Sequence, residues 1–403
     1  MKKTRQKTFD SRLNYGVLMP VFVLILIGLL SLFVALKHSS YEKILGEMMA
    51  KQITWIVIGI IAMIVVIHIN LHVLWLLSIP SYLLGLGVMV LPLFFYNPAL
   101  VKATGAKNWV SIGSQTLFQP SELMKIAYIL FLAYLIMRHN TNLSERKVAR
   151  DLLLIGKLLL ATLPILVLLK LQNDFGTVLV FLAILCGMIL LSGVSWKILF
   201  PMILTVLLLI GIFIFFITND LGRQILQKAH ILQNYQLARI DAWMNPFHDA
   251  TGKSYQQKQG LLAIGSGGLF GKGFDKTQLY VPVRESDMIF TIIGENFGFI
   301  GSTLVILLYF LLIYHMVKIT LESNNQFYTY IATGLIMMIL FHVFENIGAN
   351  IGLLPLTGIP LPFISQGGSS MVGNFLGTGL VLSMYYHQKK TIIVNCKGDR
   401  YES

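Results

Sequence analysis

The sequence predicts an all-α polytopic membrane protein with about ten transmembrane helices, and three observations support this prediction. Hydrophobic residues make up 56% of the 403 residues and charged residues only 12%, with a mean hydropathy of +0.73. A soluble domain of this composition would lack an adequate polar surface. Apolar runs near the roughly 20 residues that a helix needs to cross a bilayer recur along the chain, whereas the short alternating pattern of a membrane β-barrel is absent.

The apolar runs place the expected helices in order along the chain. Their ranges are 15–36, 52–69, 72–95, 120–137, 152–170, 175–192, 197–217, 288–315, 327–345 and 365–387. The first run is too long for a signal-peptide core and lacks a small-residue cleavage site, so we expect it to remain as the first helix. We expect one transmembrane domain over 1–403, with a long extracellular loop at 218–286 between helices 7 and 8 and a cytoplasmic tail at 388–403.

Lys and Arg are distributed unevenly between the two sides of the expected bundle. If the N-terminus is inside, the cytoplasmic segments carry fifteen of them and the short outer loops carry five. The positive-inside rule therefore predicts an N-in, C-in topology in the cell membrane, and the long loop is left out because loops beyond roughly 60 residues translocate regardless of charge. The net charge of +13 is scattered among loops, so topology explains it and we expect no nucleic-acid partner.

No cofactor motif stands out in the sequence. Cys186 lies inside an apolar run and Cys396 in the basic C-terminal segment, so they form neither a disulfide framework nor a metal site. The glycine-rich stretch at 265–273 departs from a Walker motif, because Ser266 replaces the first glycine and no Ser or Thr follows Lys272. A turn-rich loop is the simpler interpretation, although Lys272 among flexible backbone amides could still meet a phosphate.

Ionisable residues within the expected helices mark a candidate functional site, because each costs about 3 kcal/mol or more in a bilayer. Glu122 and Lys125 lie three residues apart on one helical face and can pair. Asp287, Thr291 and Glu295 follow at intervals of four and form a polar stripe. The expected topology places all of these positions in the outer half of the bilayer.

Further polar residues are expected in the same half. Glu345 and Asn346 end the ninth helix on the outer side, and Asn374 lies in the outer half of the tenth. A polar cavity that opens outward is the economical explanation for so many polar groups at one depth.

Each of these residues also has a simpler structural interpretation. The pair of Glu122 and Lys125 could have a purely structural role, as an ion pair that locks two helices together. Asp287 stands where a helix N-cap is expected. Glu295 could be a neutral, hydrogen-bonded core carboxyl. Trp109 is typical of an interfacial belt, although its indole could equally stack on a sugar ring.

Five stretches are recognisable together and cover essentially the whole chain in order. They are GAKNWVSIGSQTLFQPSELMKI at 105–126, NDFGT at 173–177, NPFHDATGKSYQQKQGLLAIGSGGLFGKGF at 245–274, RESDMIFTIIGENFGFIG at 284–301 and GLLPLTGIPLPFISQGGSS at 352–370. Taken jointly, they resemble the SEDS family (shape, elongation, division and sporulation; RodA, FtsW and SpoVE). Within that family the likeness is greatest to the rod-shape members of Gram-positive cocci and lactic-acid bacteria.

The resemblance implies a ten-helix peptidoglycan glycosyltransferase that polymerises lipid II on the outer face of the membrane, for cell elongation and shape. It implies an essential acidic residue at Asp287, a class B penicillin-binding protein as partner, and other elongation-complex membrane proteins. It also implies conserved cavity residues at Trp109, Glu122, Lys125 and Asp174. Our predicted substrate or cavity set adds Arg239, Lys272, Glu295, Ser369 and Asn374.

The sequence departs from the family pattern near the cavity motifs. Asn173 stands where the family more often has proline, Phe175 replaces a leucine, and SQGGSS replaces the commoner SYGGSS. None of these changes removes an ionisable group, so they bear on the subfamily more than on activity.

The mechanistic hypothesis makes Asp287 the general base that accepts a proton from the acceptor's GlcNAc 4-hydroxyl. Lys125, with Lys272, Arg239 or a divalent cation, would neutralise the departing pyrophosphate; no organic cofactor is expected, and the metal requirement is open. Two alternatives stay open. A lipid II flippase also fits buried charges in ten helices, although no internal repeat is found, and a non-catalytic scaffold could activate a penicillin-binding protein.

Overall fold

The structure is a computed structural model that describes residues 13–113, 115–142, 148–219, 222–224, 234–247, 254–323 and 325–398. Each of the ten expected ranges contains a helix. These helices are α1 (Tyr15–Lys37), α2 (Leu45–Ile67), α3 (Leu71–Phe94), α5 (Pro120–Asn142), α6 (Val148–Gln172), α7 (Phe175–Leu191), α8 (Trp196–Thr218), α12 (Phe290–Glu322), α13 (Gln326–Asn350) and α14 (Gly368–Gly398). Among the described residues, eight of these helices are long and apolar enough to cross a membrane; α7 is shorter, and α14 is not one of the eight.

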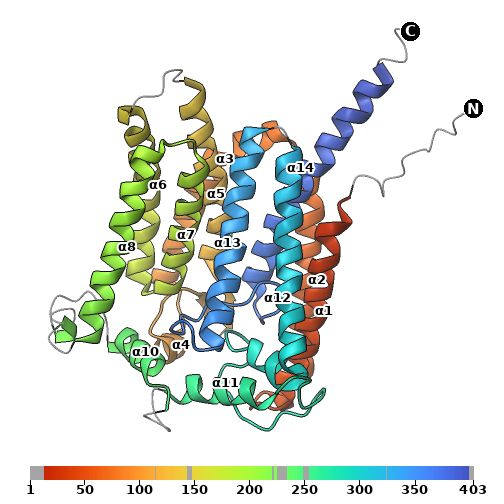
Figure 1. Cartoon of the computed structure of the whole chain (residues 1–403). Helices are drawn as coiled ribbons and strands as arrows, with labels where there is room; N and C mark the ends of the chain where they lie inside the picture. The colour runs from red at the N-terminus through yellow and green to blue at the C-terminus, as the bar shows by residue number, and fades with distance from the viewer. Residues whose placement is uncertain are drawn as a thin grey trace, which may run out of the picture.

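The long helices run side by side, and the short elements lie across one end of the bundle (Figure 1). These short elements are α4 (Pro98–Thr104), α10 (Asn234–Met244), α11 (Tyr255–Ser266), the 3-10 turn η2 (Glu42–Ile44) and the antiparallel strands β1 (Val110–Ile112) and β2 (Gln115–Phe118). The start of α1 and the end of α14 lie at the opposite end. This arrangement agrees with an even number of crossings, while the N-in, C-in orientation stays a prediction.

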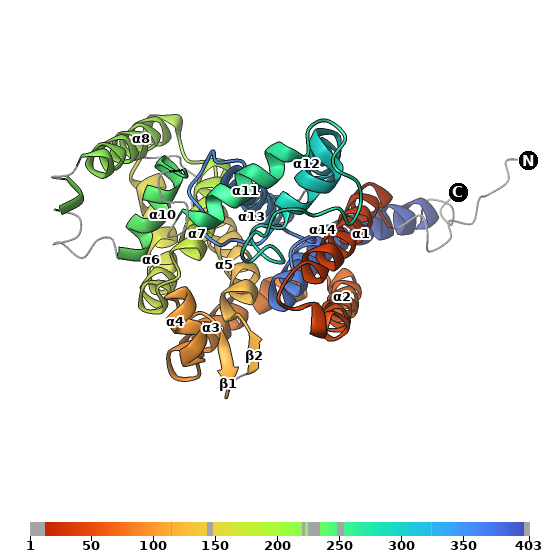
Figure 2. The same cartoon turned by 90° about the horizontal axis from the view of Figure 1, so that it is seen from below.

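Helices α5 and α13 are the most buried of the eight candidate membrane spans, and they contact each other and α7. Gly334 lets α13 approach α5 closely, because a Cβ there would lie 2.7 Å from Ile129 Cγ2. Around this centre, α14 packs on α2, α3 on α5, and α1 on α12. Viewed from the end that carries the short elements, α8 lies at the edge of the bundle (Figure 2), and its side chains are mostly exposed.

Several predicted boundaries need correction. The helix α14 extends past its predicted end at 387 to Gly398, because a helix can continue beyond its apolar run. That the segment from 388 onward is a cytoplasmic tail stays a prediction, and residues 399–403 lie outside the described part. The predicted loop at 218–286 contains α10 and α11. The ninth helix extends five residues beyond its predicted end to Asn350, because the polar residues of its last turn are buried and hydrogen-bonded.

The eighth long helix, α12, contains a kink that the apolar pattern does not reveal. Gly298 adopts φ 64° and ψ −156° inside the helix, which interrupts the helical hydrogen bonding around it. The glycine-rich loop at 267–273 supplies the missing partners. Its carbonyls at Gly268 and Leu269 accept from the amides of Phe299 and Ile300 at 2.9 and 3.1 Å. Irregular backbone at membrane depth is tolerated when other protein groups satisfy it in this way.

Replacing Gly298 with Ala is expected to lower the free energy of unfolding by at least about 1–3 kcal/mol, the usual cost of a non-glycine residue in this backbone region. A Cβ there would also lie 2.3 Å from the backbone nitrogen of Gly271. Unfolding of the purified protein in detergent measures the change. Gly156→Ala is the matched control, because that helical glycine has nothing within 4 Å of a Cβ and should tolerate alanine; equal stability of the two variants would contradict the role of the kink.

Candidate active site

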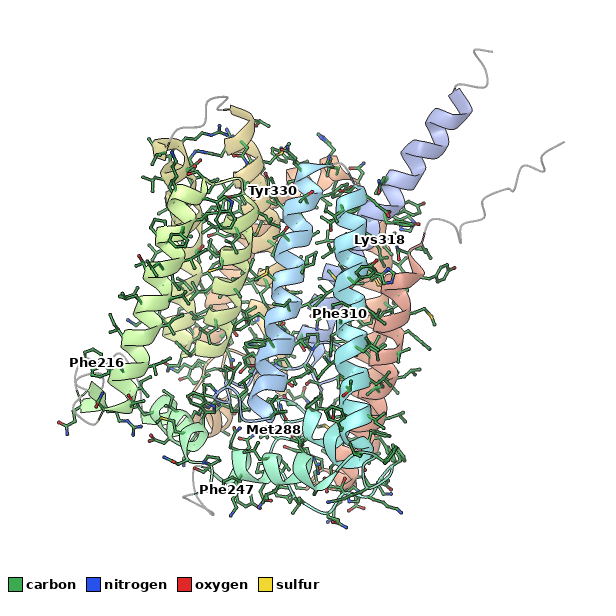
Figure 3. All side chains as sticks on the ribbon, in the orientation of Figure 1. Phe216, Phe247, Met288, Phe310, Lys318 and Tyr330 are labelled. Carbon is green, nitrogen blue, oxygen red and sulfur yellow. The ribbon has the colours of Figure 1, made fainter. Side chains whose placement is uncertain are left out.

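A cavity of about 750 Å³ lies at the end of the bundle that carries the short elements. Its walls come from segments far apart in the sequence: the hairpin region and α5, the start of α7, the end of α8, α10, and the loops that flank α12 and α14. Figure 3 shows Met288, next to Asp287, at this end of the bundle, with Lys318 and Tyr330 towards the other. Seven predicted residues line the cavity: Trp109, Glu122, Lys125, Asp174, Arg239, Asp287 and Ser369.

Asp287 is a buried carboxylate that does not cap the helix after it. Helix α12 begins at Phe290, and its N-cap is Ile289, without a side-chain capping bond. The N-cap interpretation is therefore wrong. The side chain of Asp287 is 8% exposed, and its Oδ1 has no hydrogen-bond partner among the described residues. A buried carboxylate oxygen without a structural partner is available for chemistry.

The backbone around Asp287 is fixed from several sides. Its carbonyl accepts from Asn346 Nδ2 at 2.8 Å and from Asn350 Nδ2 at 2.9 Å, and both amides belong to the last turns of α13. The preceding carbonyl, that of Ser286, accepts from Ser365 Oγ at 2.6 Å. These hydrogen bonds are accepted by main-chain carbonyls, so they position Asp287 without engaging its carboxylate.

The charges around Asp287 come from separate elements. Burial raises the pKa of Asp287 to about 6, while the Arg239 guanidinium opposes this rise and Glu285 adds to it. Arg239 projects from α10, and its Nη1 donates to Leu356 O at 3.0 Å. A Cβ on Gly358 would lie 3.7 Å from Asp287 Oδ2 and 3.8 Å from Arg239 Nη1, which is ordinary van der Waals contact, so this part of the loop lies beside both groups.

Glu122 and Lys125 form the expected ion pair on α5, and the structure adds a third member. Lys125 Nζ lies 2.8 Å from Glu122 Oε2 and 3.1 Å from His342 Nε2 on α13. Lys125 is only 2% exposed. Because an ammonium can only donate, His342 Nε2 accepts and Nδ1 carries the proton. The pair is therefore linked to a second helix through His342, as the structural interpretation predicts, and it also lines the cavity; its functional role stays a prediction.

Asp174 joins the hairpin region to α7. Its Oδ1 caps the helix by accepting from Thr177 N at 3.1 Å, and its Oδ2 accepts from Asn108 Nδ2 at 2.8 Å and Gln119 Nε2 at 3.1 Å. The preceding Asn173 has φ 58°. Proline, which the family more often has here, cannot adopt that angle, whereas Asn tolerates it. This departure from the family pattern thus has a local backbone cause.

Replacing Asn108 with Ala is expected to destabilise the folded protein by about 1.5–3 kcal/mol, because it removes a hydrogen bond to a charged, buried carboxylate. Unfolding in detergent measures the loss. Asn219→Ala is the control, because that amide donates to a local carbonyl, Phe215 O, at an exposed site, where a change within about 0.5 kcal/mol is expected. A loss at Asn108 no larger than the control would argue against the anchoring role of Asp174.

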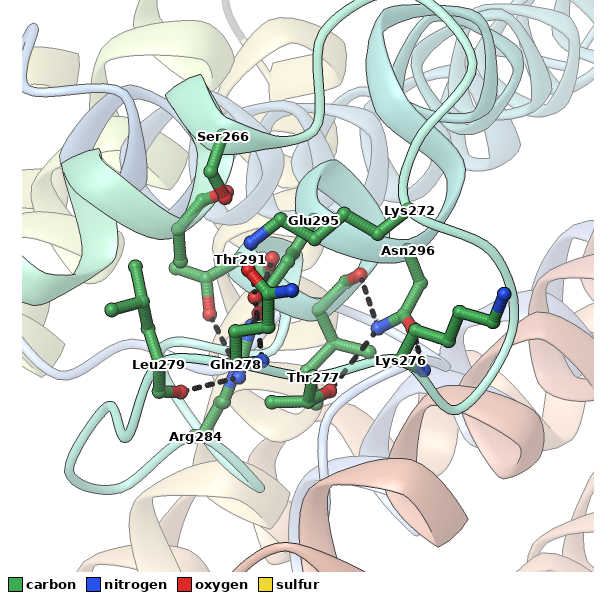
Figure 4. A network of polar contacts seen from close by, with 12 residues as sticks. Ser266, Lys272, Lys276, Thr277, Gln278, Leu279, Arg284, Thr291, Glu295 and Asn296 are labelled. Carbon is green, nitrogen blue, oxygen red and sulfur yellow. Dashed lines mark hydrogen bonds and ion pairs between the residues drawn. The ribbon is translucent and has the colours of Figure 1, made fainter.

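Three predicted residues do not line the cavity: Lys272, Glu295 and Asn374. Figure 4 shows that Lys272 and Glu295 belong to a separate polar network. Glu295, fully buried in α12, binds Lys272 Nζ at 3.0 Å and the amide of Gln278 at 2.9 Å. It also pairs with Arg284 Nη2. The interpretation of Glu295 as a neutral core carboxyl is wrong, because two cationic side chains bind it.

The sequence pattern missed three side chains that bind the predicted site residues. Arg284 pairs with Glu295, His342 accepts from Lys125, and the amide of Asn350 donates to Asp287 O. Arg284 carries no signal beyond its closeness to Asp287, and its bonds to Thr291 Oγ1 at 3.0 Å and to Leu279 O at 3.0 Å require the folded turn. His342 could have been identified from the sequence, because a histidine within an apolar membrane helix costs free energy and therefore marks a candidate functional residue. Among the described residues no group of three or more His, Cys, Asp or Glu could hold a metal ion, so the divalent cation stays a prediction.

A helical membrane bundle whose cavity holds a buried carboxylate beside cationic side chains is typical of an integral-membrane enzyme. A family model that describes cell cycle proteins of the FtsW, RodA and SpoVE type matches residues 15–390. The chain belongs to this family, which confirms the resemblance found in the sequence. The greater likeness to members from Gram-positive cocci and lactic-acid bacteria stays a prediction.

The curated relatives match over most of their length. The peptidoglycan glycosyltransferase MrdB of Escherichia coli (strain K12) is 33% identical over 394 residues, covering 95% of this chain and 97% of the relative. The stage V sporulation protein E of Bacillus subtilis (strain 168) is 31% identical over 339 residues, covering 83% and 86%. The match to the family model, over residues 15–390, includes every segment that lines the cavity.

Solved structures share the fold. A chain from a study of the structural coordination of polymerization and crosslinking by a peptidoglycan synthase complex aligns with a TM-score of 0.73 at 25% identity, covering 93% of this chain and 98% of that chain. The rod shape determining protein RodA of Thermus thermophilus aligns with a TM-score of 0.63 at 25% identity, covering 93% and 96%. The all-α membrane fold predicted from the sequence is thereby confirmed.

Proposed function

We propose that this chain is a peptidoglycan glycosyltransferase that polymerises lipid II into glycan strands at the outer face of the cell membrane, for elongation and shape. The enzyme class is that of its curated relatives. The observation that carries the mechanism is Asp287, a buried carboxylate with an unpartnered oxygen in a cavity of about 750 Å³. A cavity of this size is within the range of small-molecule and sugar sites.

Asp287 acts as the general base. It accepts the proton of the acceptor's GlcNAc 4-hydroxyl while that oxygen bonds to the anomeric carbon of the lipid-linked donor, and the bond from that carbon to the pyrophosphate breaks. A carboxyl with a pKa of about 6 is ionised at neutral pH and more basic than an exposed one. One carboxylate suffices, because a neutralised pyrophosphate leaves without the second, acidic carboxyl that glycosidases need.

Arg239 is the best placed cation for the leaving pyrophosphate. It lines the cavity with Asp287, whereas the charge of Lys125 is largely balanced by Glu122 at 2.8 Å. Lys272 pairs with Glu295 and does not line the cavity, so it is not placed to neutralise the pyrophosphate. A divalent cation, if one is bound with the substrate, would add to the same neutralisation.

The cavity also has an apolar side on which the prenyl chain fits. Ile214 and Ile217 of α8 belong to its lining, and α8 packs mainly against α6. A lipid-linked substrate could therefore keep its prenyl chain in the bilayer while its head group occupies the polar end. A class B penicillin-binding protein is the proposed partner, supported by the likeness to a chain of a peptidoglycan synthase complex.

The test is polymerisation of lipid II by the purified full-length protein, with and without a class B penicillin-binding protein. Glycan polymer is the expected product. The rate should fall as the pH drops below about 6, because protonation removes the base form of Asp287. Fluorescent lipid II that crosses proteoliposomes without being polymerised would instead support a flippase, and polymer that appears only through the partner's own activity would support a scaffold.

A further inference from the structure

The loop that follows α11 exposes two large apolar side chains, Leu269 at 64% and Phe270 at 78%. We call this pair the loop tip. The backbone on both sides of the tip is fixed on α12, through the carbonyls that bond the kink and through the amide of Lys272, which donates to Glu295 O at 2.9 Å. Because the backbone is held in this way, the two side chains project away from the protein. Exposed apolar side chains that gather in one place mark an interaction surface.

The loop tip lies beside the residues at which the straight part of α12 begins. Phe299 and Ile300 follow the kink, are bonded to the loop through their amides and have exposed side chains. Lys318, an exposed charge, lies towards the opposite end of the bundle (Figure 3). The helix rises roughly 29 Å between Phe299 and Lys318 at 1.5 Å per residue, which matches a hydrocarbon core about 30 Å thick. The boundary of the membrane on the cavity side therefore falls at the level of the tip.

Helix α1 places the loop at the same level. This helix is apolar from Tyr15 and ends at Lys37 after 23 residues, which is close to one membrane crossing. Lys37 pairs with Asp275 of the loop, and His38 Nε2 lies 2.9 Å from Asp275 Oδ1. Since α1 packs on α12, the ends of two neighbouring helices locate the loop at the edge of the bilayer.

The loop changes from apolar to polar along its length. The apolar tip is followed by Phe274, which is also exposed and whose ring centroid lies 6.4 Å from that of Phe297 on α12. Asp275 then binds the end of α1, and Lys276 is exposed. Apolar side chains next to charged ones at the end of a membrane helix are typical of an interfacial anchor.

We propose that the loop tip is a membrane anchor, in which Leu269 and Phe270 insert into the leaflet on the cavity side of the bilayer. The partner of this surface is lipid, because the tip continues the exposed apolar surface of α12 at Phe299 and Ile300. The anchor holds the contacts between the loop and α12 at a fixed depth. This inference does not rest on the proposed function.

The test measures the surroundings of a nitroxide spin label on Phe270→Cys. The full-length protein carries Cys186→Ser and Cys396→Ser, which remove the native thiols, and is reconstituted in vesicles of phosphatidylethanolamine and phosphatidylglycerol. Oxygen concentrates in the hydrocarbon and a neutral nickel chelate stays in water, so the ratio of their effects on the label reports its depth. The ratio of oxygen to nickel effect is expected to be several-fold higher at Phe270→Cys than at Lys276→Cys, the control on the polar part of the same loop.

Two further label positions complete the experiment. Leu307→Cys is the lipid reference, because this exposed residue lies in the straight part of α12, and Phe270→Cys should approach its ratio. Leu269→Cys gives an independent reading of the tip and decides the question if Phe270→Cys does not fold.

A ratio at the tip as low as that at Lys276→Cys would overturn the proposal. It would place Leu269 and Phe270 in water, where they would be free to contact a soluble protein partner instead of lipid. Because no substrate is present, the outcome does not depend on whether the chain polymerises lipid II.

Discussion

Replacing Asp287 with Asn is expected to reduce the rate of glycan polymerisation by roughly 100- to 10,000-fold, the usual contribution of a general base. Asn has nearly the same size but cannot accept the proton. The fold should persist, because Asn346 and Asn350 bind the main-chain carbonyl of this residue rather than its side chain. The measurement is the initial rate of polymer formation from lipid II by the purified variant.

Asp241→Asn controls for the loss of a carboxylate on the same face. Asp241, which belongs to α10, pairs with Arg223 and does not line the cavity, so this variant should polymerise at the wild-type rate. A wild-type rate for Asp287→Asn would refute the base and would favour the scaffold, since that alternative requires no chemistry at this position.

Replacing Glu295 with Gln is expected to destabilise the protein by about 3–5 kcal/mol, because breaking a buried ion pair leaves uncompensated charge. Arg284 is affected most, since it is buried beside Glu295 and pairs with it. Lys272 is 17% exposed and can turn towards solvent. The free energy of unfolding in detergent is the quantity to measure.

A double variant distinguishes lost charge balance from lost shape. Arg284→Met combined with Glu295→Leu removes both charges, and replacing a buried pair by apolar residues of similar volume is often neutral. The double variant should therefore be more stable than Glu295→Gln, which a double-mutant cycle quantifies. A loss below about 1 kcal/mol in the single variant would show that the network of Figure 4 contributes little to the free energy of unfolding.

The membrane helices were predictable because the bilayer sets their length, and the apolar runs report that length directly. The pairing of Glu122 with Lys125 was predictable for a similar reason, since residues three apart share a helical face. The kink at Gly298 was not, because it depends on hydrogen bonds from a loop about 30 residues earlier. The extension of α14 beyond 387 was not predicted because the apolar run is interrupted there by the four polar residues 388–391.

The site was only partly predictable, since spacing identifies candidates but not partners. Lys272 and Arg239 were equivalent cations in the sequence, and the fold assigns one to Glu295 and the other to the cavity. Asp287 looked like an N-cap because its position precedes an apolar run, yet the helix begins two residues later than that role requires. Glu345 was visible as a polar helix end, but its hydrogen bond with the Thr357 hydroxyl requires the turn at 351–358.

The glycine-rich loop has a consequence for how this protein can diverge. A Cβ at Gly267 would lie 2.0 Å from Gly294 O, and one at Gly271 would lie 2.1 Å from Asn296 O. The intervening Leu269 and Phe270 are exposed. Substitutions in this stretch are therefore confined to Leu269 and Phe270, which face outward. The exposed surface of the loop can change, whereas the two glycines in contact with α12 leave no room for a side chain.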